Sequence, residues 1–537
     1  MENKYSMENR NSMENKLKDF WSEYKGRFFF LAVSTFMIHG SRVNTANIGI
    51  DTESMIWRGR AFYDGWLDTG RQGLFLVKWL AGCIEIHPYF AQFMTMLLCA
   101  VAAFCWLYMW ERLKGGKEAS GWLPWILGGL MFISHPVLAE EFYFTLLSPE
   151  YFLGMIMVAG ALGLIGGCGE NRRQRVWRLS LSILITCWAF CIYQSFESVF
   201  ILGCVSILFV QGLEKIRSGE KVTAGGLLGA IPRYILVFGT AFAINMAVTK
   251  LFFGDSTYLE NMILWGRTAP SDNLYKILVH GVKMLTGLHC VYYHFTFGLL
   301  YLLCLIHTNV VLVRRKPGKG SVWAVLFLQA ALFIAPFLMA VLLGGAPPMR
   351  SQLVVPIMAC FLGWLLNYYP RAGKPASYAR KRRYCGYGAC ALVCVIGIFA
   401  QGRSTLDLYY TDQCRYEQDV ELGRRLIERI DEVNGDGSYP VAFIGKKPFA
   451  GNNATVRGEA FGVSFFEHDA EIEPLYYHST CRILGFLHTL GRDYRRTSEA
   501  EVEAARRYSA NMPDWPAQGS VAVHDGIVVV RLGGLDE

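Results

Sequence analysis

The chain has 537 residues, of which 53% are hydrophobic, 14% aromatic and only 18% charged. Its apolar residues gather in long blocks between residues 28 and 400, many of about the 20 residues that a helix needs to cross a bilayer. The net charge of +8 lies largely in short loops between these blocks, which excludes nucleic-acid binding as its explanation. Composition therefore excludes an ordinary soluble core and predicts a mainly α, multi-pass membrane protein.

The N-terminal residues 1–23 contain a repeated Met-Glu-Asn triplet and few apolar residues. This composition predicts a short disordered leader on the cytoplasmic side. The first apolar block, residues 28–39, is not followed by a small-residue cleavage site. We therefore expect an uncleaved membrane anchor rather than a cleaved signal peptide.

The apolar blocks predict about eleven membrane spans. They lie near residues 24–42, 88–110, 121–134, 149–168, 178–194, 197–213, 227–253, 292–313, 321–345, 351–369 and 385–400. The connections after the second, fourth, sixth, eighth and tenth spans are rich in Lys and Arg, so these connections and the N-terminus are predicted to be cytoplasmic. The other connections, several of them long and polar, then face outward, where substrates would be handled.

Residues 401–537 have the composition of a soluble domain. The patterns predict an amphipathic helix over 413–433, a buried strand over 441–445, a helix over 499–509, and a hairpin over 520–532 that turns at Asp525-Gly526. We expect a small extracytoplasmic α/β domain after a transmembrane domain over 24–400. Cys414 and Cys481 are its only cysteines, and an oxidising exterior leaves a disulfide between them open.

The connection after the first span carries the most informative residues. Asp51 and Glu53 lie two residues apart with Arg58 nearby, and in an extended chain both acids would point to one side. Paired carboxylates beside a membrane suit general-base catalysis, or binding of a divalent cation such as Mg²⁺ or Mn²⁺ next to a phosphate. The alternative is a solvated loop in which the acids pair with arginines.

Further candidate substrate-binding residues lie in later outward connections. Glu140 and Glu141 precede a run of aromatic residues, which suits either a sugar site or an interfacial aromatic belt. Gln194 and Glu197 lie where the fifth span turns into the sixth, so they would line a wet cavity or cap a helix turn. Arg350 lies in a tight outward turn without a nearby acid, and the alternative to a functional role is contact with lipid headgroups.

Over about residues 25–400 the sequence resembles the bacterial GtrII-type glucosyltransferases. The resemblance is carried in order by Asp51-Thr52-Glu53, Gly70-Arg71-Gln72-Gly73, Tyr193-Gln194-Ser195 and Arg350. It implies a GT-C architecture in the bacterial inner (plasma) membrane. It also implies an enzyme that moves a sugar, with glucose the first expectation, from a polyprenyl-phosphate carrier to a cell-envelope glycan.

The resemblance implies a catalytic base in the first outward connection, with Asp51 as the first candidate and Glu53 as the second. A carboxylate that takes the acceptor proton contributes about 10²–10⁴-fold to the rate. Arg58, Arg71 and Arg350, or a bound divalent cation, would stabilise the lipid phosphate as it leaves. No glycine-rich phosphate loop follows a predicted strand, which favours a lipid-linked donor over a sugar nucleotide.

The main alternative is a polytopic transporter or flippase of lipid-linked or small solutes. Transporters usually show internal repeats and ionisable groups at the membrane midplane. The sequence shows no clear repeat, and its acids cluster outside the spans. A glycan polymerase or acyltransferase is a closer alternative, because such enzymes also use lipid-linked substrates on the outer face. A non-catalytic scaffold would leave the acidic first connection unexplained.

Overall fold

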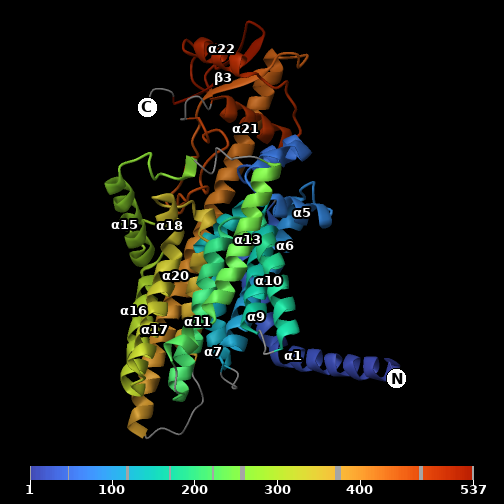
Figure 1. Cartoon of the computed structure of the whole chain (residues 1–537). Coiled ribbons are helices and arrows are strands. Elements are labelled where there is room, and N and C mark those ends of the chain that lie inside the picture. Colours follow the sequence, from blue (N-terminus) through green and yellow to red (C-terminus); the bar gives the residue numbers. More distant parts are fainter. Residues whose placement is uncertain are drawn as a thin grey trace.

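The computed structural model shows a helical bundle with a small sheet-containing domain at one end (Figure 1). The structure describes residues 2–45, 47–115, 120–167, 171–220, 223–253, 261–368, 377–470 and 476–534. The long helices run roughly side by side, and the N-terminal part of the first helix projects from the end opposite to the sheet-containing domain (Figure 1).

Eight helical segments among the described residues are long and apolar enough to cross a membrane. They are α6 (Pro88–Leu113), α9 (Ser148–Gly166), α10 (Arg172–Ile192), α11 (Phe196–Ser218), α12 (Ala224–Leu228) with α13 (Ile231–Phe252), α16 (Phe295–Arg315), α17 (Lys319–Ile334) with α18 (Leu338–Leu343), and α20 (Ser377–Val433) from Gly388 onward. Each coincides with a predicted span, and the mainly α polytopic bundle is confirmed.

The other three predicted spans differ from simple straight crossings. α1 (Glu2–His39) contains the first of them and also includes residues 2–23, for which composition predicts a disordered leader. The third, 121–134, corresponds to α7 (Trp122–Ile133), and after a bend of 50° the chain continues as α8 (Pro136–Tyr143), because Pro136 has no N–H to continue the helix. α19 (Val354–Asn367) has only 14 residues, all of them buried.

The first long connection folds into a series of short helices. They are α2 (Ser41–Asn44), α3 (Thr52–Arg58), η1 (Gly59–Phe62), α4 (Asp64–Asp68) and α5 (Gln72–Leu80). A later connection contains α15 (Pro270–Thr286), which packs against α16 and α18. The described parts of these connections therefore contain regular helices, and the first connection contacts the sheet-containing domain through α3.

The C-terminal domain contains β1 (Val441–Gly445), α21 (Tyr476–Thr489), α22 (Glu499–Ser509), β2 (Val521–His524) and β3 (Ile527–Gly533). The sheet order is β1-β3-β2, with β1 parallel to β3 and β2 antiparallel to it. The predicted strand, helix and hairpin are confirmed. The predicted span over 385–400 and helix over 413–433 prove to be parts of one helix, α20: no proline lies in the intervening residues 401–412, and their one glycine, Gly402, is accommodated within the helix.

A buried ion-pair network joins α20 to the first connection. Arg415 donates to Asp412 at 2.5 Å and to Asp419 at 3.1 Å, and Arg42 of α2 donates to the other oxygen of Asp412 at 2.5 Å. Arg415 also donates to the carbonyl of Ile48 at 3.3 Å. These charged side chains are at most 3% exposed, so the network fixes the segment before Asp51 against α20.

Candidate functional site

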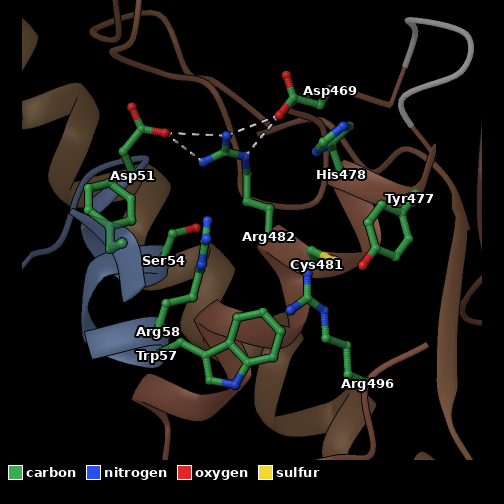
Figure 2. A pocket seen from close by; sticks show the side chains of 11 residues that line it. Asp51, Ser54, Trp57, Arg58, Asp469, Tyr477, His478, Cys481, Arg482 and Arg496 are labelled. Atoms are coloured by element: carbon green, nitrogen blue, oxygen red, sulfur yellow. Dashed lines mark hydrogen bonds and ion pairs between the residues drawn. The ribbon is translucent and has the colours of Figure 1, made fainter. Parts of the chain in front are cut away.

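The acids of the first connection meet an arginine of the C-terminal domain. Arg482, on α21, donates to Glu53 at 2.7 Å, to Asp51 at 3.3 Å and to Asp469 at 3.0 Å. Figure 2 shows its guanidinium between Asp51 and Asp469. One cation therefore contacts three carboxylates from two distant parts of the sequence.

The backbone around Asp51 explains how both acids reach Arg482. The expectation of an extended Asp-x-Glu is wrong, because α3 begins at Thr52 and Glu53 lies in its first turn. Asp51 precedes the helix with a φ of 73°, a left-handed conformation that Asp tolerates better than most residues. The preceding residue, Ile50, donates its backbone N–H to the Tyr143 hydroxyl at 3.2 Å, which anchors the turn to α8.

Gly49 allows this turn to approach α8 closely. A Cβ atom at this position would lie 2.6 Å from both the carbonyl oxygen and a ring carbon of Tyr143. We expect Gly49→Ala to displace the Asp51 turn, at a cost of about 1–3 kcal/mol in the free energy of unfolding. Gly65→Ala in α4, where a Cβ would meet nothing within 4 Å, is the matched control. Equal unfolding temperatures for the two variants in detergent would contradict this expectation.

The two acids of the first connection differ in exposure. The Glu53 side chain is fully buried, whereas that of Asp51 is 43% exposed. Burial raises the pKa of Glu53 to about 7, with the charge of Arg482 opposing the rise and that of Asp51 adding to it. Burial also acts to raise the pKa of Asp469, but the close contact with His468 and the charge of Arg482 outweigh it and lower this pKa to about 2.

The raised pKa of Glu53 predicts a pH-dependent stability. Its folded form keeps a proton that the unfolded chain releases near pH 4.5, so its contribution is full below that pH and is lost as pH rises through about 7. The loss amounts to about 3 kcal/mol. We expect the free energy of unfolding in detergent to fall more between pH 5 and pH 8 for the native protein than for Glu53→Gln. Asp469 does not contribute to this difference, because its lowered pKa lies outside the range from pH 5 to pH 8. Equal falls for the two proteins would rule out Glu53 as the group responsible.

A pocket of about 430 Å³ opens beside Asp51 and Arg482. Its walls come from the first connection and the C-terminal domain, through Asp51, Ser54, Trp57, Arg58, Phe62, Asp469, Tyr477, His478, Cys481, Arg482 and Arg496 (Figure 2). The Arg496 guanidinium lies over the rings of Trp57 at 5.5 Å and Tyr477 at 5.8 Å. Aromatic rings beside charged groups suit a sugar ligand.

Cys481 and Cys414 are free thiols, so the disulfide left open by the sequence is absent.

The arrangement does not fit a divalent cation at Asp51 and Glu53. Within the described part of the chain, no group of three or more His, Cys, Asp or Glu side chains is placed to hold a metal ion. The guanidinium of Arg482 contacts both carboxylates and would compete with a cation for them. We therefore assign no step to a metal.

Three other predicted site residues lie near the buried hydroxyl of Tyr151. Glu141, Arg71 and Arg350 interact electrostatically with Tyr151. Both carboxylate oxygens of Glu141 are buried and have no hydrogen-bond partner in the described structure. Its neighbour Glu140 accepts hydrogen bonds from the Tyr292 hydroxyl and from the backbone N–H of Ala460.

The two arginines of this cluster lie over aromatic rings. Arg71 lies 5.0 Å from the ring centre of Tyr193, and Arg350, in the turn η3 (Met349–Ser351), lies 4.9 Å from that of Phe144. Such stacking orients a guanidinium. The cluster thus offers two oriented cations beside a buried carboxylate.

Two of the sequence motifs are brought together here. Gln194 donates to the carbonyl of Thr69 at 2.6 Å, so Tyr193-Gln194-Ser195 lies beside Gly70-Arg71-Gln72-Gly73. Glu197 is not joined to them: it is partly buried in the first turn of α11, and its carboxylate forms no hydrogen bond or ion pair with any described residue.

The sequence model of the family described as glucosyl transferase GtrII matches residues 40–367. The chain belongs to the GtrII glucosyltransferase family. This membership indicates a glycosyltransferase, and the apolar helices indicate that it is a multi-pass membrane protein. No curated protein and no solved structure matches the chain.

The GtrII match includes Asp51, Glu53, Arg71 and Arg350 but ends before the C-terminal domain. Arg482 is therefore a residue that neither the family resemblance nor a local motif indicates. The apolar residues Ile483, Phe486 and Leu487 have helical spacing and could have predicted α21. No pattern in the sequence pairs position 482 with position 51.

Proposed function

We propose that this GtrII-family protein transfers a glucosyl unit from a polyprenyl-phosphate carrier to a cell-envelope glycan. In this proposal residues 24–400 form a GT-C-like catalytic domain of the bacterial plasma membrane, with a cytoplasmic N-terminus and residues 401–537 outside. The observation that carries the proposal is the carboxylate of Asp51, which lies within the family match and at the edge of a sugar-sized pocket.

Asp51 is the catalytic base of the proposed reaction. As the acceptor hydroxyl attacks the anomeric carbon, its proton passes to Asp51, and the bond from that carbon to the phosphate oxygen breaks with its electron pair on the phosphate. Glu53 is the weaker candidate, because its side chain is fully buried and its pKa of about 7 leaves it partly protonated at neutral pH.

The leaving phosphate requires positive charge near the anomeric carbon. Arg71 and Arg350 supply this charge in the proposal, because both are oriented by ring stacking and both interact electrostatically with Tyr151. Glu140, Glu141 and Gln194 would bind sugar hydroxyls. Arg58, which lines the pocket beside Asp51, belongs to the acceptor side. Glu197, the remaining candidate, forms no described contact with these residues.

A comparison of donors tests the proposed function. Membranes containing the native protein, and matched membranes without it, are supplied with radiolabelled glucose on polyprenyl phosphate or on a nucleotide. We expect label in the glycan only with the lipid-linked donor and only with the protein present. Equal labelling from the nucleotide donor after depletion of endogenous polyprenyl phosphate would reject the lipid-linked donor.

A further inference from the structure

The C-terminal domain reaches into the candidate site with a pre-oriented side chain. Arg482 is held from its own domain by Asp469, which in turn lies 2.9 Å from the ring nitrogen Nδ1 of His468. Its side chain is only 12% exposed. α21 packs directly against α3: a Cβ atom at Gly485 would be in ordinary van der Waals contact, 3.4 Å from Trp57 and 3.5 Å from Glu53.

The acids that Arg482 contacts would repel one another without it. A guanidinium within hydrogen-bonding distance of both carboxylates offsets the repulsion between them. The planar fork of Arg482 also fixes direction, because its Nη1 donates to both Asp51 and Glu53. It can therefore hold the Asp51 side chain in place at the edge of the pocket.

We propose that Arg482 is a positioning residue through which the C-terminal domain completes the glucosyltransferase site. The domain lies outside the matched family region, so the site of this chain is built from the family's catalytic region and an additional domain. Arg482 acts through Asp51 and not on the donor. The expected effect of Arg482 on glucosyl transfer rests on the proposed function. Its anchoring of the turn that carries Asp51 rests on the contacts alone.

Hydrogen exchange tests the structural consequence without any assay of activity. We expect backbone amides of residues 48–58 to exchange at least tenfold faster in Arg482→Gln than in the native full-length protein in detergent, with Arg482→Lys intermediate. The matched control is Arg492→Gln, which removes a more exposed ion pair with Asp431 in the same domain. Native-like exchange of residues 48–58 in Arg482→Gln would overturn the proposal, as would faster exchange throughout the domain in both the Gln and Lys variants.

A double-mutant cycle tests the catalytic consequence. Arg482→Gln is expected to lower glucosyl transfer on the order of 10²-fold in the native background. In the Asp51→Asn background it should cost almost nothing further, because a residue that acts through Asp51 has nothing left to position. A loss of transfer in the double variant that equals the product of the two single-variant losses would contradict this expectation. Absence of transfer by the native protein would reject the proposed function instead, while the exchange result would still decide the positioning role.

Discussion

Asp51→Asn is expected to lower glucosyl transfer by about 10²–10⁴-fold at unchanged protein abundance. Asparagine keeps the size of the side chain and can still accept a hydrogen bond from Arg482, but it cannot take the proton of the acceptor hydroxyl. The side chain is 43% exposed, so the fold should not depend on its charge. The measurement is the initial rate of glycan labelling, normalised to the amount of protein in the membrane.

The control for Asp51→Asn is Asp64→Asn, which removes an exposed carboxylate of the same connection that does not line the pocket. This control should keep the native rate. Glu53→Gln should lose less activity than Asp51→Asn, because Glu53 does not contact the pocket. A native rate for Asp51→Asn, or a larger loss for Glu53→Gln, would move the base away from Asp51.

Arg415→Gln is expected to destabilise the folded protein by about 3–5 kcal/mol. Its guanidinium is fully buried between Asp412 and Asp419, and its removal leaves buried carboxylates without their main cation. It also contacts the carbonyl of Ile48, so its loss should loosen the turn that carries Asp51. The measurement is the free energy of unfolding in detergent, or the unfolding temperature where unfolding is irreversible.

Arg425→Gln on the same helix provides the comparison for Arg415→Gln. Arg425 pairs with Glu421 at 2.5 Å, but both side chains are 64% exposed. An exposed pair contributes at most about 1 kcal/mol, so this variant should unfold almost as the native protein does. Equal destabilisation by the two substitutions would show that burial of the Arg415 network is not what stabilises it.

The sequence predicts the helical bundle well because membrane spans need long apolar segments, and these are visible without tertiary information. The bend at Pro136 and the shortness of α19 were not predicted, since both depend on how neighbouring helices pack. The C-terminal strands and α22 follow from periodicity and turn residues. The continuity of α20 does not follow from the sequence, because an apolar pattern changes into an amphipathic pattern within this one helix.

The candidate site was only partly predictable. Asp51 and Arg58 carry a local signal, and the structure places both beside one pocket. The contact of Asp51 with Arg482 joins positions 431 residues apart, and no spacing rule relates residues at that separation. The cluster of Arg71, Glu141 and Arg350 could not be predicted for the same reason, since only tertiary packing brings these three residues near Tyr151.

Reconstitution of the purified protein in vesicles tests the central claim most directly. The vesicles carry polyprenyl-phosphate-linked radiolabelled glucose and are given cell-envelope glycan, and both glycan labelling and movement of the donor across the bilayer are followed. The glucosyltransferase account predicts labelled glycan with the native protein and about 10²-fold less or lower with Asp51→Asn. Movement of the donor without any labelling of the glycan would contradict it and favour a flippase.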